Sequence, residues 1–202
     1  MISVARTAAA LAVVLGSCSL TSVEPIPIVG KAPRSLLVLP PVGRAPAELV
    51  PELRRVLENR GYRVVPMADG YAELEARGLM ETGTHPSESY AAAARALDAD
   101  AFVTVRVERW QTRFRTRLLT LDYDLGYRLW SADSGELQWE ARVSDVRRWE
   151  RPSAHFDSSL ESYLRPSEEL SAGLPFRDET EVVSAVHRRA LGRLPRAPGV
   201  DH

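Results

Sequence analysis

The sequence of 202 residues has one cysteine, few aromatic residues and no excess of either charge. A single cysteine can form no internal disulfide and excludes a zinc site built on several thiolates. A formal net charge of -1, from 26 basic and 27 acidic residues, gives no electrostatic basis for broad nucleic-acid binding. No apolar run approaches the roughly 20 residues that a membrane-spanning helix needs. What remains, 45% apolar and 26% charged residues, is the composition of an ordinary globular protein that builds its own core.

The N-terminal segment has the pattern of a secretory signal. Arg6 precedes an apolar run over residues 8–15, and small residues follow. The motif LGSC at residues 15–18 resembles a bacterial lipobox, whose cysteine is diacylated and becomes the mature N-terminus. Because the only cysteine stands where this motif requires it, we predict a lipoprotein signal peptide over residues 1–17 and lipid attachment, palmitate included, at Cys18. The alternative is a plain signal peptide with an incidental cysteine.

The residue after Cys18 bears on localisation. Ser19 is not the aspartate associated with retention in the inner membrane, which favours a lipid-anchored protein of the bacterial outer membrane that faces the periplasm. Residues 18–33 contain three prolines, which suppress helix and favour extended chain. They predict a flexible tether that could hold the domain up to about 45 Å from the bilayer. Residues 195–202 are expected to form a flexible tail, which leaves residues 34–194 as a single domain.

The domain begins with a β-α-β pattern. The apolar run at residues 35–39 is typical of a strand buried on both faces. Apolar residues then recur at helical spacing over residues 49–57, Gly61 is placed as a helix cap, and residues 62–66 form a second strand. This order favours a parallel pair with a right-handed crossover. Further helices are expected at residues 71–77 and 86–97.

The middle of the chain predicts three strands, over residues 101–110, 117–130 and 136–146, the last two joined by a hairpin turn. The second strand alternates between apolar and polar residues, so one sheet face should be core and the other polar. Residues 147–177 have no periodicity and are expected to be irregular, and residues 178–194 form an amphipathic helix. The fold class is therefore α/β, a mixed sheet of about five strands packed by helices in two or three layers.

Four motifs occur in an order that resembles the GNA family of bacterial lipoproteins, a family without an assigned function: PRSLLVLPP at 33–41, GYRVVP at 61–66, DADA at 98–101 and DSGELQW at 133–139. The resemblance covers residues 33–146. It implies a fold similar to the N-terminal domain of TolB and to the periplasmic domains of CsgG and LpoB, which are envelope proteins that work by protein contact. It implies a protein-interaction module with no established catalytic residues to transfer, and nothing in residues 147–177 matches it.

The sequence contains no established catalytic or metal-binding motif. His85, His155 and His187 lie outside any zinc-protease, nucleophile-elbow or nucleotide-binding pattern. We expect structural or solvated roles for them, with His187 on the exposed side of the last helix. We predict a protein that is not an enzyme, with no metal, cofactor or small-molecule substrate. An envelope hydrolase remains an alternative that requires a histidine or paired carboxylates to converge in a pocket.

Two groups of residues are candidates for binding a partner. Asp122 and Asp124 project from the polar strand face, where arginines on neighbouring strands predict cross-strand ion pairs. The sequence RRWER at 147–151 places Trp149 among Arg147, Arg148 and Arg151, the composition of a binding hot spot. The alternative for Trp149 is packing beneath the irregular segment, with the arginines as a solvated rim.

These observations predict a lipid-anchored, non-catalytic interaction module of a periplasmic or outer-membrane assembly. Its partner would be an unidentified envelope protein or a second copy of the chain. The polar sheet face and residues 147–177 would form the partner surface. An oligomeric secretion component similar to CsgG is the alternative, because residues 117–130 are long enough for a tilted barrel strand and alternate correctly.

Overall fold

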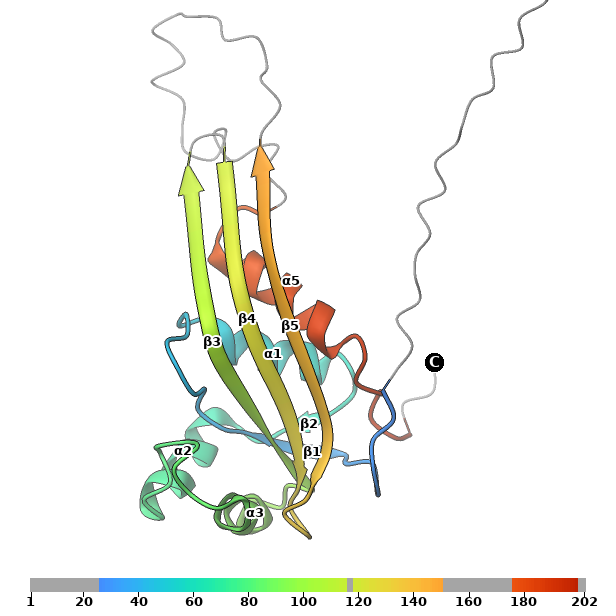
Figure 1. Ribbon diagram of the computed structural model, residues 1–202. Coiled ribbons are helices and arrows are strands. Elements are labelled where there is room, and N and C mark those ends of the chain that lie inside the picture. The colour runs from blue at the N-terminus through green and yellow to red at the C-terminus, as the bar shows by residue number, and fades with distance from the viewer. Residues whose placement is uncertain (1–25, 116–117, 151–175, 200–202) are drawn as a thin grey trace, which may run out of the picture.

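The computed structural model describes residues 26–115, 118–150 and 176–199 (Figure 1). They contain a mixed sheet of five strands in the order β2-β1-β3-β4-β5. The strands are β1 (Ser35–Val38), β2 (Arg63–Val64), β3 (Ala101–Arg115), β4 (Leu118–Ser131) and β5 (Leu137–Glu150). Strand β1 is parallel to both of its neighbours, β2 and β3, and β4 is antiparallel to both of its neighbours, β3 and β5. The predicted fold class is confirmed.

Helices cover both faces of the sheet at one end. The alternation of β1 shows why, because Leu36 and Val38 lie in one apolar cluster and Leu37 and Leu39 in another. The first cluster packs under α1 (Leu49–Glu58) and α5 (Glu179–Leu191), and the second under α2 (Met67–Ala76) and α3 (Ser87–Ala96). The described helices include none long and apolar enough to cross a bilayer.

Local signals set the ends of two helices, and the cap at Gly61 was expected. Gly61 follows α1 with a φ of 89°, a left-handed conformation that glycine adopts without strain, and its N–H donates to the carbonyl of Glu58 at 2.9 Å. At the start of α5, the carboxylate of Asp178 accepts a hydrogen bond from the N–H of Glu181 at 3.0 Å. The second helix, by contrast, begins at Met67, four residues before the expected Tyr71.

The three long strands extend beyond the helices α2 and α3, so that among the described helices α5 covers their outer halves, on one face (Figure 1). Strand β3 continues to Arg115, beyond its expected end at residue 110. Strand β5 continues to Glu150 and so enters residues 147–177, which were expected to be irregular. Pairing with β4 imposes this regular structure, since Arg147 lies opposite Leu121 and Trp149 opposite Leu119. Residues 151–175 of that segment lie outside the described residues.

The described parts of the expected tether and tail are hydrogen-bonded to the domain. The N–H of Ile26 donates to the carbonyl of Arg193, and that of Val29 donates to Gln138, each at 2.9 Å. Ala197 is buried, and its N–H donates to the carbonyl of Arg60 at 3.1 Å. Prolines prevent helix in these segments, so composition alone suggested flexible chain. An extended chain with prolines can still form backbone hydrogen bonds with an edge of the domain.

Candidate binding site on the open sheet face

We use the term open face for the side of β3–β5 that α1 and α5 do not cover. The strand register places its side chains in rows across the three strands. Arg106 of β3, Gly126 of β4 and Arg142 of β5 lie directly opposite one another in one row. The following rows toward α3 are Thr104, Arg128 and Glu140, and then Phe102, Trp130 and Leu137.

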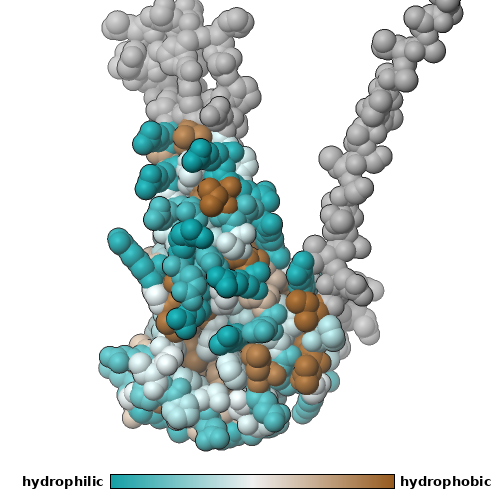
Figure 2. All heavy atoms as spheres, in the orientation of Figure 1, coloured by the Kyte–Doolittle hydropathy of each residue, from teal (hydrophilic) through white to brown (hydrophobic). Residues whose placement is uncertain are grey.

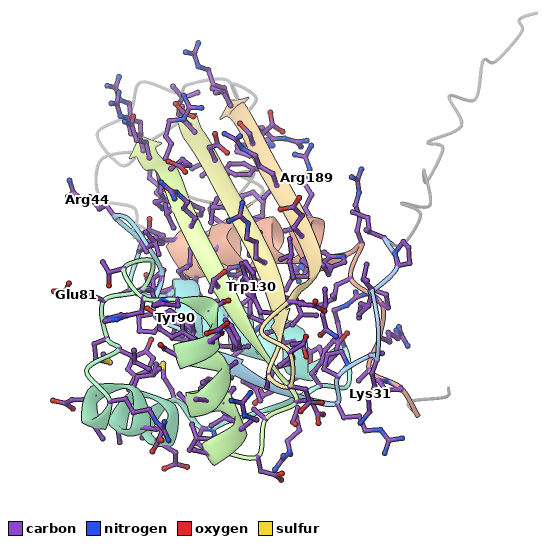
Figure 3. The ribbon with its side chains drawn as sticks, turned by 60° about the horizontal axis from the view of Figure 1, so that its bottom comes forward. Lys31, Arg44, Glu81, Tyr90, Trp130 and Arg189 are labelled. Carbon is purple, nitrogen blue, oxygen red and sulfur yellow. The ribbon has the colours of Figure 1, made fainter. Side chains whose placement is uncertain are left out.

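Apart from Leu137, the residues of these rows line one wall of a hollow of about 670 Å³. The opposite wall comes from the chain before α3, at Gly83 and His85, and from Tyr90 of that helix. Figure 3 shows Tyr90 on α3 and Trp130 on β4, on the side of the sheet where α3 lies. A volume of this size suits a small ligand or a few residues of a peptide.

Aromatic rings line the inner end of the hollow. The rings of Phe102 and Trp130 are nearly parallel, with centroids 6.2 Å apart, and Tyr90 lies 6.1 Å from Phe102. The indole N–H of Trp130 donates to Oγ1 of Thr104 at 3.3 Å, and the hydroxyl of Tyr90 donates to the carbonyl of Glu81 at 3.1 Å. These bonds hold both rings in place, so the apolar end of the hollow is preformed.

The rim of the hollow carries arginines with carboxylate neighbours. Arg142 makes a bidentate pair with Asp124 at 2.8 and 2.7 Å, and this guanidinium holds the pKa of Asp124 below its usual value. Nε of Arg106 lies 2.5 Å from Glu108, and Nε of Arg128 lies 3.4 Å from Glu140. All three arginine side chains are more than half exposed, at 67, 56 and 69% for Arg106, Arg128 and Arg142. A guanidinium has five N–H donors, so donors remain for a ligand.

The residues predicted to bind a partner are divided between the two faces of the sheet. Asp122 and Asp124 lie on the open face and form the predicted cross-strand ion pairs, with Arg109 at 2.9 Å and with Arg142. Arg148 is exposed on the same face, opposite Thr120. Arg147 and Trp149 face α5 instead, and Arg151 lies outside the described residues.

Trp149 packs between β5 and the chain leading into α5. Its ring meets that of Phe176 edge to face, with centroids 5.5 Å apart, and it is half-buried against the main apolar cluster. Asp145, on the same face, accepts hydrogen bonds from Arg147 and Arg189, each at 2.6 Å, and these lower the pKa of Asp145 to about 2. Trp149 thus packs against the domain, while residues 151–175 of the irregular segment beneath which it was expected to pack lie outside the described residues.

The expectation for His187 is wrong, because this residue is fully buried between α5, α1 and β4. Its Nε2 lies 2.9 Å from the carbonyl oxygen of Leu49 and its Nδ1 lies 2.9 Å from the hydroxyl of Tyr127. A carbonyl only accepts, so Nε2 donates and Nδ1 accepts from Tyr127. Burial lowers the pKa of His187 to about 4 and keeps the ring neutral.

The other histidines give no catalytic or metal site among the described residues. His85 is half-buried, with its ring 6.0 Å from that of Tyr90. Tyr90 belongs to the apolar cluster under α2 and α3, whereas the hydrogen-bond partners of His187 belong to the cluster under α1 and α5. His155 lies outside the described residues. In the part of the chain that the structure describes, no three residues of the types His, Cys, Asp and Glu are grouped to hold a metal ion.

Sequence reasoning missed Gly126 and the two arginines beside it. One local signal was present: glycine interrupts the polar face of an otherwise regular alternating strand, where it weakens the strand. The arginines could not be connected with it, because only the register of β3–β5 brings residues 106, 126 and 142 into one row.

No family model and no curated protein matches this chain. Solved structures do resemble it. Lipoprotein GNA1162 from Neisseria meningitidis is 19% identical with a TM-score of 0.47, covering 78% of this chain and 97% of its own. A PelC dodecamer from Paraburkholderia phytofirmans is 15% identical with a TM-score of 0.46, covering 85% and 93%.

The C-terminal domain of LpoB from Salmonella enterica is 18% identical with a TM-score of 0.42, covering 58% of this chain and 85% of its own. A GNA lipoprotein and an LpoB domain are thus among the solved structures similar to this chain. Such similarities do not indicate which residues of this chain bind a partner.

Proposed function

We propose that this protein is a lipid-anchored lipoprotein of the bacterial envelope that binds a protein partner through the open face, without catalysing a reaction. The observation that supports this most directly is the hollow on that face. It combines a fixed aromatic end with arginines that retain free N–H donors, the residue types enriched at protein interfaces.

The arrangement of the histidines gives a hydrolase little support. Among the described residues, the hydroxyl hydrogen-bonded to a histidine is that of Tyr127, and this pair is buried in the core. A nucleophile must lie beside its base and be reachable by substrate, and the buried Tyr127–His187 pair meets only the first condition.

Cys18 and the packing of the next described residues support an anchor that keeps the domain near the membrane. Because the backbone of Ile26 is hydrogen-bonded to the domain, only residues 19–25 separate the lipidated cysteine from it. At about 3.1–3.6 Å per residue the chain spans at most roughly 25–30 Å there, less than the 45 Å expected for a tether of the full length. Val29 in this region is 70% exposed, and Figure 2 shows hydrophobic side chains at the lower right of the molecule.

The first test of this proposal is the lipid itself. Mass spectrometry of the membrane-extracted protein should show acyl chains on Cys18 and no residues before it, and Cys18→Ala should leave the detergent phase in a detergent partition. An unmodified cysteine in the mature protein would overturn the anchor.

The second test is cross-linking of the native lipoprotein in cells, with Cys18→Ala as the unanchored control. An envelope protein that is cross-linked reproducibly and lost in the control is expected. Links between copies of the chain alone would instead favour the oligomeric secretion component, and a ring in electron micrographs would identify it.

Self-association has a specific structural basis. Strand β5 is the outer strand of the sheet, and Val29 pairs with it at Gln138, near its start. Further along, the described residues provide β5 with no second neighbouring strand. A long strand with an unpaired edge is a template for pairing with another chain.

A further inference from the structure

We propose that the hollow over Gly126 binds an extended segment of the partner protein that presents a carboxylate and an apolar side chain on one face. The carboxylate would lie between Arg106 and Arg142, and the apolar side chain would lie against Trp130 and Tyr90. This inference rests on the proposed function and specifies the binding site and the chemistry that the site recognises.

The presence of Gly126 inside β4 needs a physical explanation, because a glycine inside a strand weakens the strand. Such glycines occur at bulges, at sharp bends or where a ligand or another backbone approaches closely. Gly126 lies in continuous register with its neighbours, and the irregularities of pairing occur elsewhere, between Val107 and Arg109 and between Leu129 and Trp130. Its φ lies outside the left-handed region, so its backbone conformation suits any residue.

Packing within the described residues does not require this glycine either. A Cβ built on Gly126 would meet no atom within 4 Å. The strand backbone is therefore bare and accessible at the bottom of the hollow. Close approach by something outside the chain is the explanation that remains.

The arginines beside this bare backbone determine the charge of the ligand. Neighbouring strands lie about 4.8 Å apart, so the backbones of Arg106 and Arg142 are about 10 Å apart, with no side chain between them. The hollow is lined by four arginines and two glutamates, and Asp124 pairs with one of these arginines, Arg142, so one positive charge is in excess. The fork of a guanidinium matches the two oxygens of a carboxylate, so an acidic group is the complementary ligand.

The distance between the charged and aromatic rows determines the spacing in the ligand. Gly126 and Trp130 are four residues apart on one strand, which corresponds to about 13 Å. An extended segment that runs along β4 meets both rows with residues four positions apart, because this spacing also spans about 13 Å and alternate residues of an extended chain share a face. The expected sequence therefore has Asp or Glu four residues from an aromatic or aliphatic residue.

The test uses defined peptides and the full-length lipoprotein in detergent micelles. Peptides are selected from a random 12-residue display library, synthesised, and titrated by fluorescence anisotropy. We expect selected sequences to have the acidic and apolar residues at this spacing. Replacing the acidic residue by its amide should weaken binding at least tenfold. Selection of peptides without an acidic residue would overturn the proposal.

Gly126→Val is the decisive variant, because it fills the bare position without disturbing the fold. We expect peptide binding to fall at least tenfold while the melting temperature stays the same or rises, since valine favours strands and its Cβ meets no atom. Thr120→Val is the matched control on the same strand and face, outside the hollow, and should bind as the wild type does. Equal binding by Gly126→Val and the wild type would contradict the site.

Arg106→Gln and Arg142→Gln test the charge. Each should reduce the preference for the acidic peptide over its amide, which a loss of general stability would not do. If Gly126→Val still bound every selected peptide and still cross-linked to the partner in cells, the proposed site would be wrong and the proposed function would stand. Loss of acylation at Cys18 would instead affect the proposed function alone.

Discussion

The same three strands lie in two different environments along their length. Near β1, in the part we call the base, β3–β5 are covered by helices on both faces, whereas their outer halves, the arm, are covered by α5 on one face (Figure 1). Phe102 on the base is 1% exposed, and Val146, on the same face of the arm, is 57% exposed. The comparison teaches that strand alternation sets which residues share a face, while the helices decide whether that face is buried. The hollow lies where this second cover ends.

The largest expected effect separates the base from the arm directly. Phe102→Ala should lower the free energy of unfolding by about 3–5 kcal/mol, because it leaves a cavity among Tyr90, Trp130 and their neighbours. Phe114→Ala makes the same chemical change in the arm and should cost below about 1 kcal/mol. Urea unfolding measures both, and equal losses would show that the two regions do not differ in burial.

The second effect is a pH dependence confined to the base. The pKa of His187 is about 4 in the folded protein and about 6.5 in the unfolded chain, so the unfolded state binds more protons between these values. Stability should be complete above pH 6.5 and fall by on the order of 3 kcal/mol as the pH drops toward 4. Urea unfolding at a series of pH values checks this.

A matched variant isolates the histidine. His187→Phe should be less stable at neutral pH, because the Leu49 carbonyl and the Tyr127 hydroxyl lose their partner, but its stability should change little between pH 6.5 and 4. A slope that persists in the variant would assign the pH dependence to other groups.

The third effect concerns the contact between β5 and the chain before α5. Trp149→Ala should destabilise the protein by about 1–2 kcal/mol without unfolding it, because the ring is half-buried against Phe176. A double-mutant cycle with Phe176→Ala should give a coupling of about 0.5–1.5 kcal/mol. A coupling near zero would show that Trp149 does not depend on Phe176.

The smallest effect lies at the surface of the arm. Asp145→Asn should cost about 1 kcal/mol or less, since exposed ion pairs such as those with Arg147 and Arg189 contribute little. Because the pKa of Asp145 is lowered to about 2, its contribution is present above pH 4 and is lost as the pH falls toward 2. Acid titration of wild type and variant should diverge only in that range, below the range of His187.

Most of the fold could be predicted from the sequence, while little of the candidate site could. The β-α-β start, the long alternating strand and the last helix each have a strong local pattern. The outer half of β5 has a weak pattern, and pairing with β4 keeps it extended. His187 was misplaced because histidine was assigned to the polar side of a helix, although its position shares the apolar stripe with Val183 and Leu191.

The sequence by itself determined the lipobox at Cys18, the order and type of the main elements, and which residues of each strand share a face, because these depend on neighbours along the chain. Only the tertiary structure decided that Arg106, Gly126 and Arg142 form one row, that residues 147–150 continue strand β5, and that residues from Ile26 onward lie on the domain. These features depend on strand register and on the docking of helices far apart in sequence, whose free energies are set by contacts that no local pattern contains.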